Sequence, residues 1–354
     1  DNPSGQLVEV SFDSDESLST IDVSGDGNAP LNESDFSESG NATTGFTYNA
    51  TLSDNADGTF NATLDMATDA AGNDGATGQN DSVTVDTAAP TVENPTPAEG
   101  ANVSDASQNY TVDISDATSG VNNSSISVTV SDADGTVLDS VTTSDGNVSF
   151  DGTTLTVDGQ TYADGQVTVD VNVDDNAGNS ATEFSSSFTV DTTSPTAVVN
   201  SPTGVTVQSG ETVTVDYNAT DTNFDEARVI VDNGPDNDII NRTVAEGNST
   251  IDINPSSTDG TYDVRLVVTD AAGNTAQDTN ADAITVDATA PTVDDPTPAD
   301  GATVADASQN YTVNISDATS GVNNSTIAVT VEDADGIVLN GATTSDGNVS
   351  FDGT

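Results

Sequence analysis

The sequence predicts an all-β protein built from tandem β-sandwich domains in a linear array, with the last domain incomplete. Three observations lead to this prediction. Apolar residues alternate with polar ones over many short stretches, a long segment of the chain occurs twice, and turn and linker signals recur at domain-sized intervals.

The alternation of apolar and polar residues has a period of two. It is clearest in Ile126–Val130, Val167–Val173 and Val264–Val268. This pattern is typical of antiparallel strands with one face buried and one face in water. Aspartate-glycine pairs such as Asp134-Gly135 and Asp164-Gly165 stand between such stretches and indicate turns. We find no convincing helical period, so short strands joined by turns are expected throughout.

A repeat sets the domain plan. The segment Pro90–Thr153 recurs as Pro291–Thr354 at an offset of 201 residues, and thirteen of the 64 positions differ. The string Asp-Ala-Ala-Gly-Asn occurs at 69–73 and 270–274, and the related Asp-Asn-Ala-Gly-Asn at 175–179. These spacings indicate a two-domain unit that was duplicated.

Proline-containing linkers mark the boundaries because proline ends a strand and stiffens the joint. They predict domains at 1–88, 89–192, 193–288 and 289–354. The last domain is a partial sandwich, since its twin continues beyond Thr153 with further strands. We expect either that the sequence is a piece of a longer array or that another chain donates the missing strands.

The charge is extreme. Sixty acidic residues face three basic ones, Arg228, Arg242 and Arg265, for a net charge of −57. Such a chain repels itself in dilute buffer, but at 1 M salt the Debye length is only about 3 Å. Because the acid is spread along the whole chain, we interpret it as adaptation to high salt. The alternative, a disordered acidic chain, conflicts with the strand periodicity.

The same composition excludes several functions. A surface this acidic does not neutralise phosphates or bind anionic lipid, and no apolar run is long enough to span a bilayer. Without His, Cys or Lys, catalysis reduces to carboxylate pairs, and 4% aromatic residues in thin sandwiches offer no sugar cleft. We predict that the chain is not an enzyme. The three arginines make either local salt bridges or a contact with an acidic neighbour.

A combination of motifs resembles the immunoglobulin-like, cadherin-like tandem repeats of bacterial and archaeal surface proteins. It consists of an aspartate-glycine pair, an alternating strand, D-x-A-G-N and a closing strand that ends in T-V-D-T-x-x-P-T. Here it runs through Gly165, Asp175–Asn179 and Thr189–Thr196, and again through Gly260, Asp270–Asn274 and Thr285–Thr292. The resemblance covers nearly the whole chain. It implies an immunoglobulin-like fold and a haloarchaeal stalk, adhesin, S-layer or filament protein, often stiffened by calcium.

The loops of such sandwiches predict calcium sites at the joints. The loop after the second strand and the loop before the last strand lie at one end of the domain, where the preceding linker also arrives. Carboxylates that converge there suit Ca²⁺, although aspartates in loops also serve simply as turn formers. The predicted groups are Asp86, Asp116 and Asp175 at the first joint, Asp191, Asp221 and Asp270 at the second, and Asp287 and Asp317 at the third. The short D-x-D-G at Asp132–Gly135 is expected to be a hairpin turn.

Asn-x-Ser/Thr motifs predict export and N-linked glycans. The chain begins at Asp1 without Met or an apolar leader, which we interpret as a mature or partial chain. The candidate acceptors are Asn32, Asn41, Asn49, Asn61, Asn80, Asn102, Asn109, Asn122, Asn147, Asn218, Asn241, Asn248, Asn310, Asn314, Asn323 and Asn348; Asn123 and Asn324 form overlapping motifs.

Together these features predict a structural, extracellular cell-surface glycoprotein of a halophile. Its tandem domains form a rod or a self-assembling array such as an S-layer, filament or sheath, with identical chains or other surface proteins as partners. Two alternatives remain open. One is a monomeric adhesin stalk that presents a binding domain outside these residues, and the other is an accessory module of a secreted hydrolase.

Overall fold

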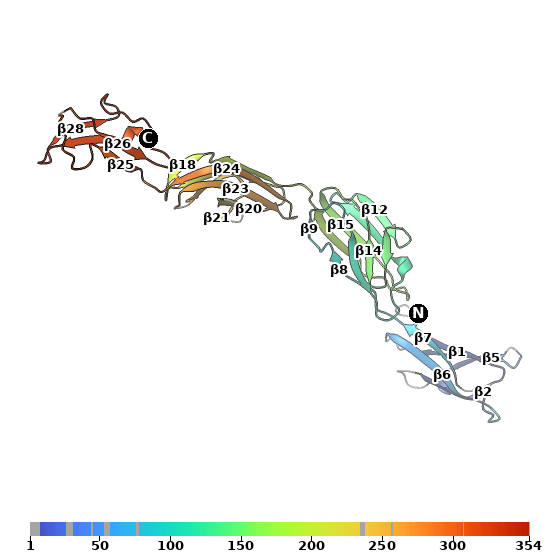
Figure 1. Cartoon of the computed structure of the whole chain (residues 1–354). Helices are drawn as coiled ribbons and strands as arrows, with labels where there is room; N and C mark the ends of the chain where they lie inside the picture. Colours follow the sequence, from blue (N-terminus) through green and yellow to red (C-terminus); the bar gives the residue numbers. More distant parts are fainter. Residues whose placement is uncertain are drawn as a thin grey trace. The chain divides into compact units, whose positions relative to one another are not determined.

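The computed structural model describes residues 8–25, 31–43, 45–52, 57–75, 78–233, 238–255, 258–306 and 308–353, and confirms the predicted all-β fold (Figure 1). The regular elements in these residues are strands, apart from the single-turn 3₁₀ helices Glu33–Asp35, Asn123–Ser125 and Asn324–Thr326. The described residues contain no helix long and apolar enough to cross a bilayer. The chain divides into two compact units, Asp1–Thr193 and Ser194–Thr354. The four predicted domains and the three boundaries between them stay predictions.

The first unit begins with two antiparallel sheets, ordered β1-β5-β4 and β3-β2-β6-β7. Their strands are β1 (Val8–Ser14), β2 (Leu18–Gly25), β3 (Leu31–Asn32), β4 (Ser37–Asn41), β5 (Gly45–Leu52), β6 (Gly58–Asp69) and β7 (Gln79–Val85). Between the sheets Tyr48 stacks on Phe12 with ring centroids 5.3 Å apart, and its hydroxyl donates to Glu38 and accepts from the N–H of Leu18.

The same unit continues with a four-stranded sheet, β13-β14-β10-β8, and a five-stranded sheet, β12-β11-β15-β16-β9. Their strands are β8 (Thr91–Thr96), β9 (Asn102–Val103), β10 (Tyr110–Ser115), β11 (Ser127–Asp132), β12 (Val137–Thr142), β13 (Val148–Phe150), β14 (Thr154–Val157), β15 (Gly165–Asn172) and β16 (Phe184–Val190). The strand β9 pairs parallel with β16, and the other pairs are antiparallel.

The second unit opens with the sheets β17-β19-β22 and β18-β24-β23-β20-β21. Their strands are β17 (Thr196–Ser201), β18 (Val205–Gln208), β19 (Val213–Thr220), β20 (Phe224–Asp232), β21 (Asp238–Val244), β22 (Gly247–Ile253), β23 (Gly260–Asp270) and β24 (Thr275–Asp287). Two two-stranded sheets follow, β25-β26 and β27-β28, made of β25 (Thr292–Thr297), β26 (Thr312–Ser316), β27 (Ala328–Glu332) and β28 (Val338–Thr343).

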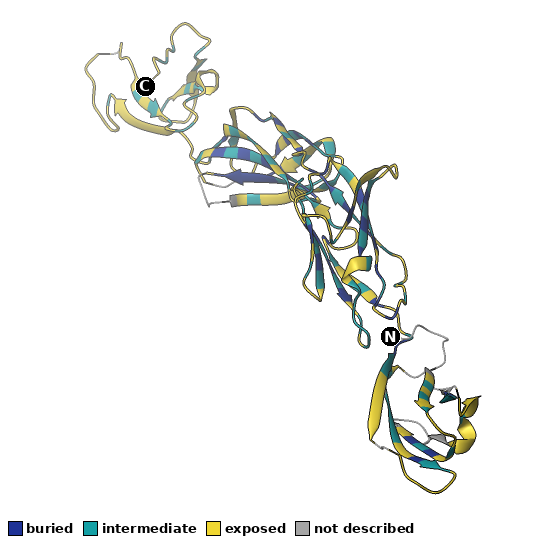
Figure 2. Cartoon of the chain, turned by 90° about the vertical axis from the view of Figure 1, so that its right-hand side faces the viewer, coloured by how far each residue is buried: buried dark blue, intermediate teal, exposed yellow. Residues whose placement is uncertain are grey.

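Burial follows the predicted period of two. In β15 the valines at 167, 169 and 171 are at most 2% exposed while the residues between them are half-buried, and β23 repeats this pattern over eleven residues (Figure 2). The paired sheets of residues 91–190 enclose one apolar cluster, and those of residues 196–287 enclose another. More than half of the residues in these two clusters are valine, in keeping with the low aromatic content of the chain.

The duplicated segment shows how burial depends on distant strands. In the first copy Tyr110 and Val130 are buried, with 1% and 0% exposure. Their counterparts Tyr311 and Val331 are 59% and 49% exposed. The difference arises because β14, β15 and β16 cover the first copy, whereas the second copy is described only as its two hairpin-like sheets.

The arginines make local contacts. Arg228 lies 3.0 Å from Glu226, and Arg265 lies 3.4 Å from Asp232, as expected for salt bridges within one sheet. Arg242 donates a long hydrogen bond to the carbonyl of Asp252.

Two buried tyrosines make the stability of the fold depend on pH in the alkaline range. Burial raises the pKa of Tyr110 to about 12, aided by the charges of Glu99 and Asp170 and opposed by its hydrogen bond with Ser186, and burial raises the pKa of Tyr162 to about 12 as well. A pKa above the unfolded value of about 10 stabilises the fold below pH 10. Two pKa units set an upper bound of about 2.7 kcal/mol per tyrosine, which solvent screening reduces, and this contribution is lost as the pH rises through 12.

We therefore expect amide hydrogen exchange in β10 and β16 to accelerate between pH 10 and 12 beyond the intrinsic increase. Tyr110→Phe removes the titrating hydroxyl and should flatten part of this rise. An exchange profile that is the same in Tyr110→Phe and in the original chain would contradict the prediction.

Candidate functional site

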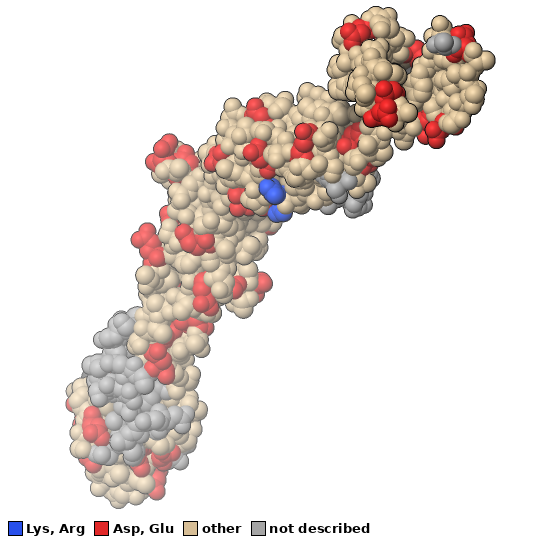
Figure 3. Space-filling model, turned by 90° about the vertical axis from the view of Figure 1, so that its left-hand side faces the viewer, with Lys and Arg blue, Asp and Glu red and all other residues tan. Residues whose placement is uncertain are grey.

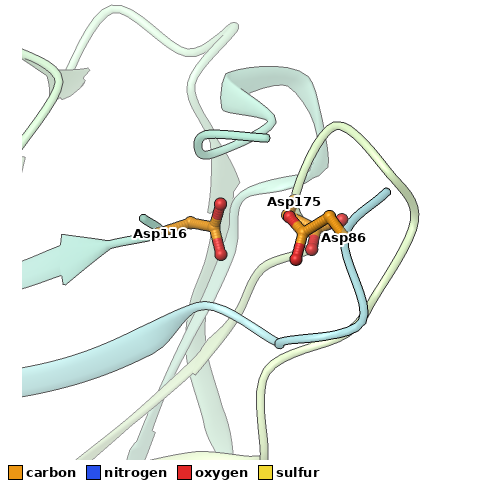
Figure 4. Close-up of side chains that lie close together, drawn as sticks. All are labelled: Asp86, Asp116 and Asp175. Atoms are coloured by element: carbon orange, nitrogen blue, oxygen red, sulfur yellow. The ribbon is translucent and has the colours of Figure 1, made fainter. Parts of the chain in front are cut away.

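The first predicted group of carboxylates comes together within the first unit (Figure 4). Asp86 follows β7, Asp116 follows β10, and Asp175 lies in the turn after β15. One carboxylate oxygen from each lies within 4.8 Å of the others. Asp86 and Asp175 are 0% and 1% exposed, and Asp116 is half-buried. We call these three residues the Asp86 cluster.

The loop after β10 positions Asp116 through its own backbone. The Oδ1 atom of Asp116 accepts hydrogen bonds from the N–H groups of Thr118, Ser119 and Gly120 at 3.2, 3.0 and 2.7 Å. The N–H of Ser119 also donates to Oδ2 of Asp86 at 2.9 Å. The N–H of Ser119 therefore binds both the loop's own aspartate and the linker aspartate.

The turn after β15 reaches the linker through Asn179. Its Nδ2 donates to Oδ2 of Asp175 at 2.7 Å and to the carbonyl of Asp86 at 3.0 Å, and its N–H donates to Oδ1 of Asp175 at 2.8 Å. Sequence reasoning did not single out Asn179. The signal was available, because the last asparagine of D-x-A-G-N is present in all three copies of the motif.

The D-x-A-G-N motif is first of all a turn. Asp69, like Asp175, accepts hydrogen bonds from the N–H and the Nδ2 of the asparagine four residues later, and these bonds lower the pKa of Asp69. Asp270 makes the same bonds to Asn274. Only Asp175 and Asp270 are nearly fully buried. The motif therefore forms the turn in all three copies. Burial of its first aspartate marks the two copies, at Asp175 and Asp270, that lie near other carboxylates.

Electrostatics makes the Asp86 cluster unusual. Residues 1–193 contain no Lys, Arg or His, so no basic side chain of this unit neutralises its carboxylates. Burial opposes ionisation of Asp86, but hydrogen bonds from Ser119 and Ala88 outweigh it and lower the pKa of that carboxyl. Asp86 is therefore anionic at neutral pH. Charged groups without a counter-ion are expensive to bury, and this one is held beside two more carboxyl groups.

The residues of the second predicted group are divided between the two units. Asp221 and Asp270 belong to the second unit, with carboxylate oxygens within 4.8 Å of each other. Asp191 belongs to the first unit, where it accepts from the N–H of Thr193, so its place beside them stays a prediction.

At the third predicted joint, Asp287 and Asp317 share a donor. The N–H of Ser320 donates to Oδ2 of Asp287 at 3.2 Å and to Oδ1 of Asp317 at 2.9 Å, which reproduces the role of Ser119. Hydrogen bonds from Ser320 and Thr289 lower the pKa of Asp287.

Three aspartate-glycine pairs, at Asp57, Asp164 and Asp259, also hold the linker that follows their sandwich. Asp164 accepts from the N–H and hydroxyl of Thr192 at 3.0 and 2.8 Å and from the hydroxyl of Thr193 at 2.8 Å, and these bonds lower its pKa. Asp57 accepts from the N–H and hydroxyl of Thr87, and Asp259 accepts from the N–H of Ala288 and the hydroxyl of Thr289. Each pair therefore fastens the following linker to its own sandwich, which sequence reasoning missed because linker and turn lie about 30 residues apart. The glycine is needed because φ at Gly165 is +134°.

The hairpin expected at Asp132–Gly135 is present. Asp132 accepts from the N–H groups of Asp134 and Thr136, and β11 pairs antiparallel with β12 on either side.

None of the predicted glycan acceptors with a described side chain is buried; the side chain of Asn32 lies outside the described residues. Asn122 and Asn323 also cap 3₁₀ helices by accepting from Ser124 and Ser325. Their use as acceptors stays a prediction.

No protein-family model matches the sequence, and no curated protein matches it. Among solved structures, a three-domain immunoglobulin segment of titin aligns with 81% of this chain and 94% of its own, at 15% identity and a TM-score of 0.35. Fibronectin(III)-like modules of CbhA from Clostridium thermocellum align with 56% of this chain and 93% of theirs, at 16% identity and a TM-score of 0.33. A Ca²⁺-stabilized, ice-binding adhesin of an Antarctic bacterium aligns with 79% of this chain and 69% of its own, at 25% identity and a TM-score of 0.29. All three TM-scores are below 0.5, and what these proteins bind is not carried over to this chain.

Asn179 provides a test of how the linker is held. Asn179→Ala removes the Nδ2 bonds to Asp86 and Asp175, which should cost about 1–2 kcal/mol and speed amide exchange around residues 82–91 at least several-fold. The matched control is Asn73→Ala, which removes only the bond to Asp69 within its own turn. Equal exchange at residues 82–91 in both variants would contradict a linker role for Asn179.

Proposed function

We propose that this chain is a non-catalytic, structural protein of a cell surface, in which tandem sandwiches act as spacers and as building blocks of an array. The Asp86 cluster carries this proposal. It joins the end of β7 to two loops of the following sandwich, and such a junction serves to hold successive domains at a fixed distance. The finer assignment, to an S-layer, filament or sheath, belongs to the same proposal.

The described sandwiches support a structural role. The two clusters enclosed by residues 91–190 and 196–287 are mainly aliphatic, and aspartates such as Asp116, Asp175 and Asp164 accept hydrogen bonds in loops, turns and linkers. A carboxylate bound to several N–H groups is stabilised as the anion, so it has no proton to donate at neutral pH and is a weak general base. Such aspartates suit architecture better than acid–base chemistry.

Calcium fits the Asp86 cluster. Ca²⁺ takes six to eight oxygen ligands, and carboxylates are its preferred protein donors. Three carboxylates within 4.8 Å of one another, two of them buried and none accompanied by a basic side chain, form a set of hard oxygen donors with an uncompensated negative charge. A bound Ca²⁺ would supply the missing positive charge and tie the linker to both loops.

Salt adaptation accounts for the rest of the acid. On the face shown in Figure 3 the acidic residues are scattered rather than gathered into one patch, and the few basic atoms form one small group. At multimolar salt the repulsion between scattered carboxylates is screened within about 3 Å, so the net charge of −57 does not oppose folding or association.

A calcium titration tests this proposal. At constant ionic strength Ca²⁺ should raise the midpoint of thermal unfolding of the first unit, and a chelator should reverse the rise. Asp116→Asn keeps the Oδ1 acceptor but removes a negative charge. It should therefore stabilise the chelated protein, because the repulsion between the three carboxylates falls. It should also weaken the affinity for Ca²⁺ at least about tenfold.

The matched control is Asp132→Asn, which alters a half-buried turn aspartate with the same kind of backbone hydrogen bonds. It should leave the calcium response unchanged. The site is disproved if chelation leaves unfolding and small-angle scattering of the original chain unaltered.

Surface location has its own test. Glycopeptide mass spectrometry of protein from the native source should find N-linked glycans on exposed acceptors such as Asn102, Asn109 and Asn248. Unmodified asparagine at every acceptor would remove this support for export.

A further inference from the structure

The strand β28 is a sheet edge. It pairs with β27 among the described strands, through Ala328–Thr343 to Glu332–Val338, and no described strand flanks its other side. The duplicated copy shows that this position remains an edge in a larger sheet, because β12 is the outermost strand of β12-β11-β15-β16-β9. An edge strand presents unpaired N–H and C=O groups to any strand that approaches.

Both edge strands carry exposed apolar residues at their hairpin end, and the second copy carries one more. In the first copy Val137 and Leu138 are 57% and 50% exposed although the rest of the sandwich is present. In the second copy Ile337, Val338 and Leu339 are 61%, 58% and 65% exposed. These exposures are high because the three residues lie at the hairpin end of an outermost strand, where the register shifts next to Glu332.

The two copies diverge most at this edge. Four of their thirteen differences fall within six positions, where Thr136, Asp139, Ser140 and Val141 become Ile337, Asn340, Gly341 and Ala342. Asp139 stands opposite Val130, which is buried, and accepts from Nε2 of Gln160 at 2.6 Å. A charge turned toward the core at a sheet edge is a known device against edge-to-edge pairing. The second copy has the uncharged Asn340 in place of Asp139, and it has Ile337 in place of Thr136.

The result is an uncharged strip in a highly charged chain. Residues 336–345 contain no acidic residue, although the chain averages one in about six. Asp333 and Asp335 precede the strip and Asp346 follows it. Two copies that carry −57 each can approach along this strip without placing carboxylates in its centre.

We propose that β28 is a self-association edge, at which β28 of one copy pairs antiparallel with β28 of a second copy of this chain. A strand edge is complementary to itself under a twofold rotation, so one strip serves both partners. The six residues of β28 span about 20 Å at about 3.3 Å each, which gives main-chain hydrogen bonds but a small buried area. The pairing is therefore weak and reversible, and it strengthens at high salt, where the flanking aspartates are screened.

This inference rests on the proposed structural role and locates the self-association that the role requires. Sedimentation velocity of the full 354-residue chain at about 3 M NaCl should show a monomer–dimer equilibrium that shifts to monomer in low salt. Ile337→Thr with Asn340→Asp restores the residues of the first copy and should weaken dimerisation at least about tenfold. Both substitutions reproduce residues that the folded first copy already carries, and circular dichroism checks that the variant keeps its strand content.

The first copy supplies the reverse experiment. Thr136→Ile with Asp139→Asn removes the inward-facing charge of β12. It should make β12 a second self-association edge, so that assemblies grow beyond the dimer. Because the chain has no cysteine, Leu339→Cys with a short bifunctional maleimide should cross-link dimers, whereas Leu138→Cys should not.

A chain that stays monomeric over the accessible concentrations at high salt would overturn the inference, and so would a dimer that survives Ile337→Thr/Asn340→Asp. These outcomes leave the calcium response of the Asp86 cluster untouched, so failure of the edge and failure of the structural proposal are separable.

Discussion

The structure depends on one repeated interaction, an aspartate carboxylate that accepts hydrogen bonds from backbone N–H groups a few residues away. This bond closes the hairpin at Asp132, forms the turn at Asp69, Asp175 and Asp270, and shapes the loop at Asp116. Because each carboxylate is bound as the anion, the fold uses the negative charge that its sequence carries in excess. The acidic composition is thus part of the architecture as well as of the surface.

Longer-range hydrogen bonds to aspartates connect the sandwiches to their linkers. In the linker after β7, Asp57 holds Thr87 on one side, while on the other Asp86 is held by Ser119 and Asn179. A linker fixed at both of its ends has few conformations left, so the joint is stiffened before any ion binds. Within the proposed role, calcium then adds charge neutralisation to a junction that hydrogen bonds have already shaped.

Local patterns in the sequence predicted what local physics controls. The alternation in β15 and β23, the turn at Asp132 and the convergence of Asp86, Asp116 and Asp175 follow from strand periodicity, turn chemistry and sandwich topology. The contacts of Asn179 and Asp164 did not follow, because they join residues 28 to 93 positions apart. The different burial of the two copies of the repeat could not be predicted from local sequence either. Tyr110 and Tyr311 have matching neighbours in sequence, yet one is buried and the other exposed, since the covering strands lie far along the chain.

The placement of the arginines has a consequence for turnover. Proteases of the trypsin type cleave after Lys or Arg, and these 354 residues contain no Lys and three Arg. Arg228, Arg242 and Arg265 all lie within the paired strands β20, β21 and β23, where the backbone is unavailable to a protease active site until the sheet opens locally. The scarcity of basic residues therefore leaves such enzymes almost nothing to cut.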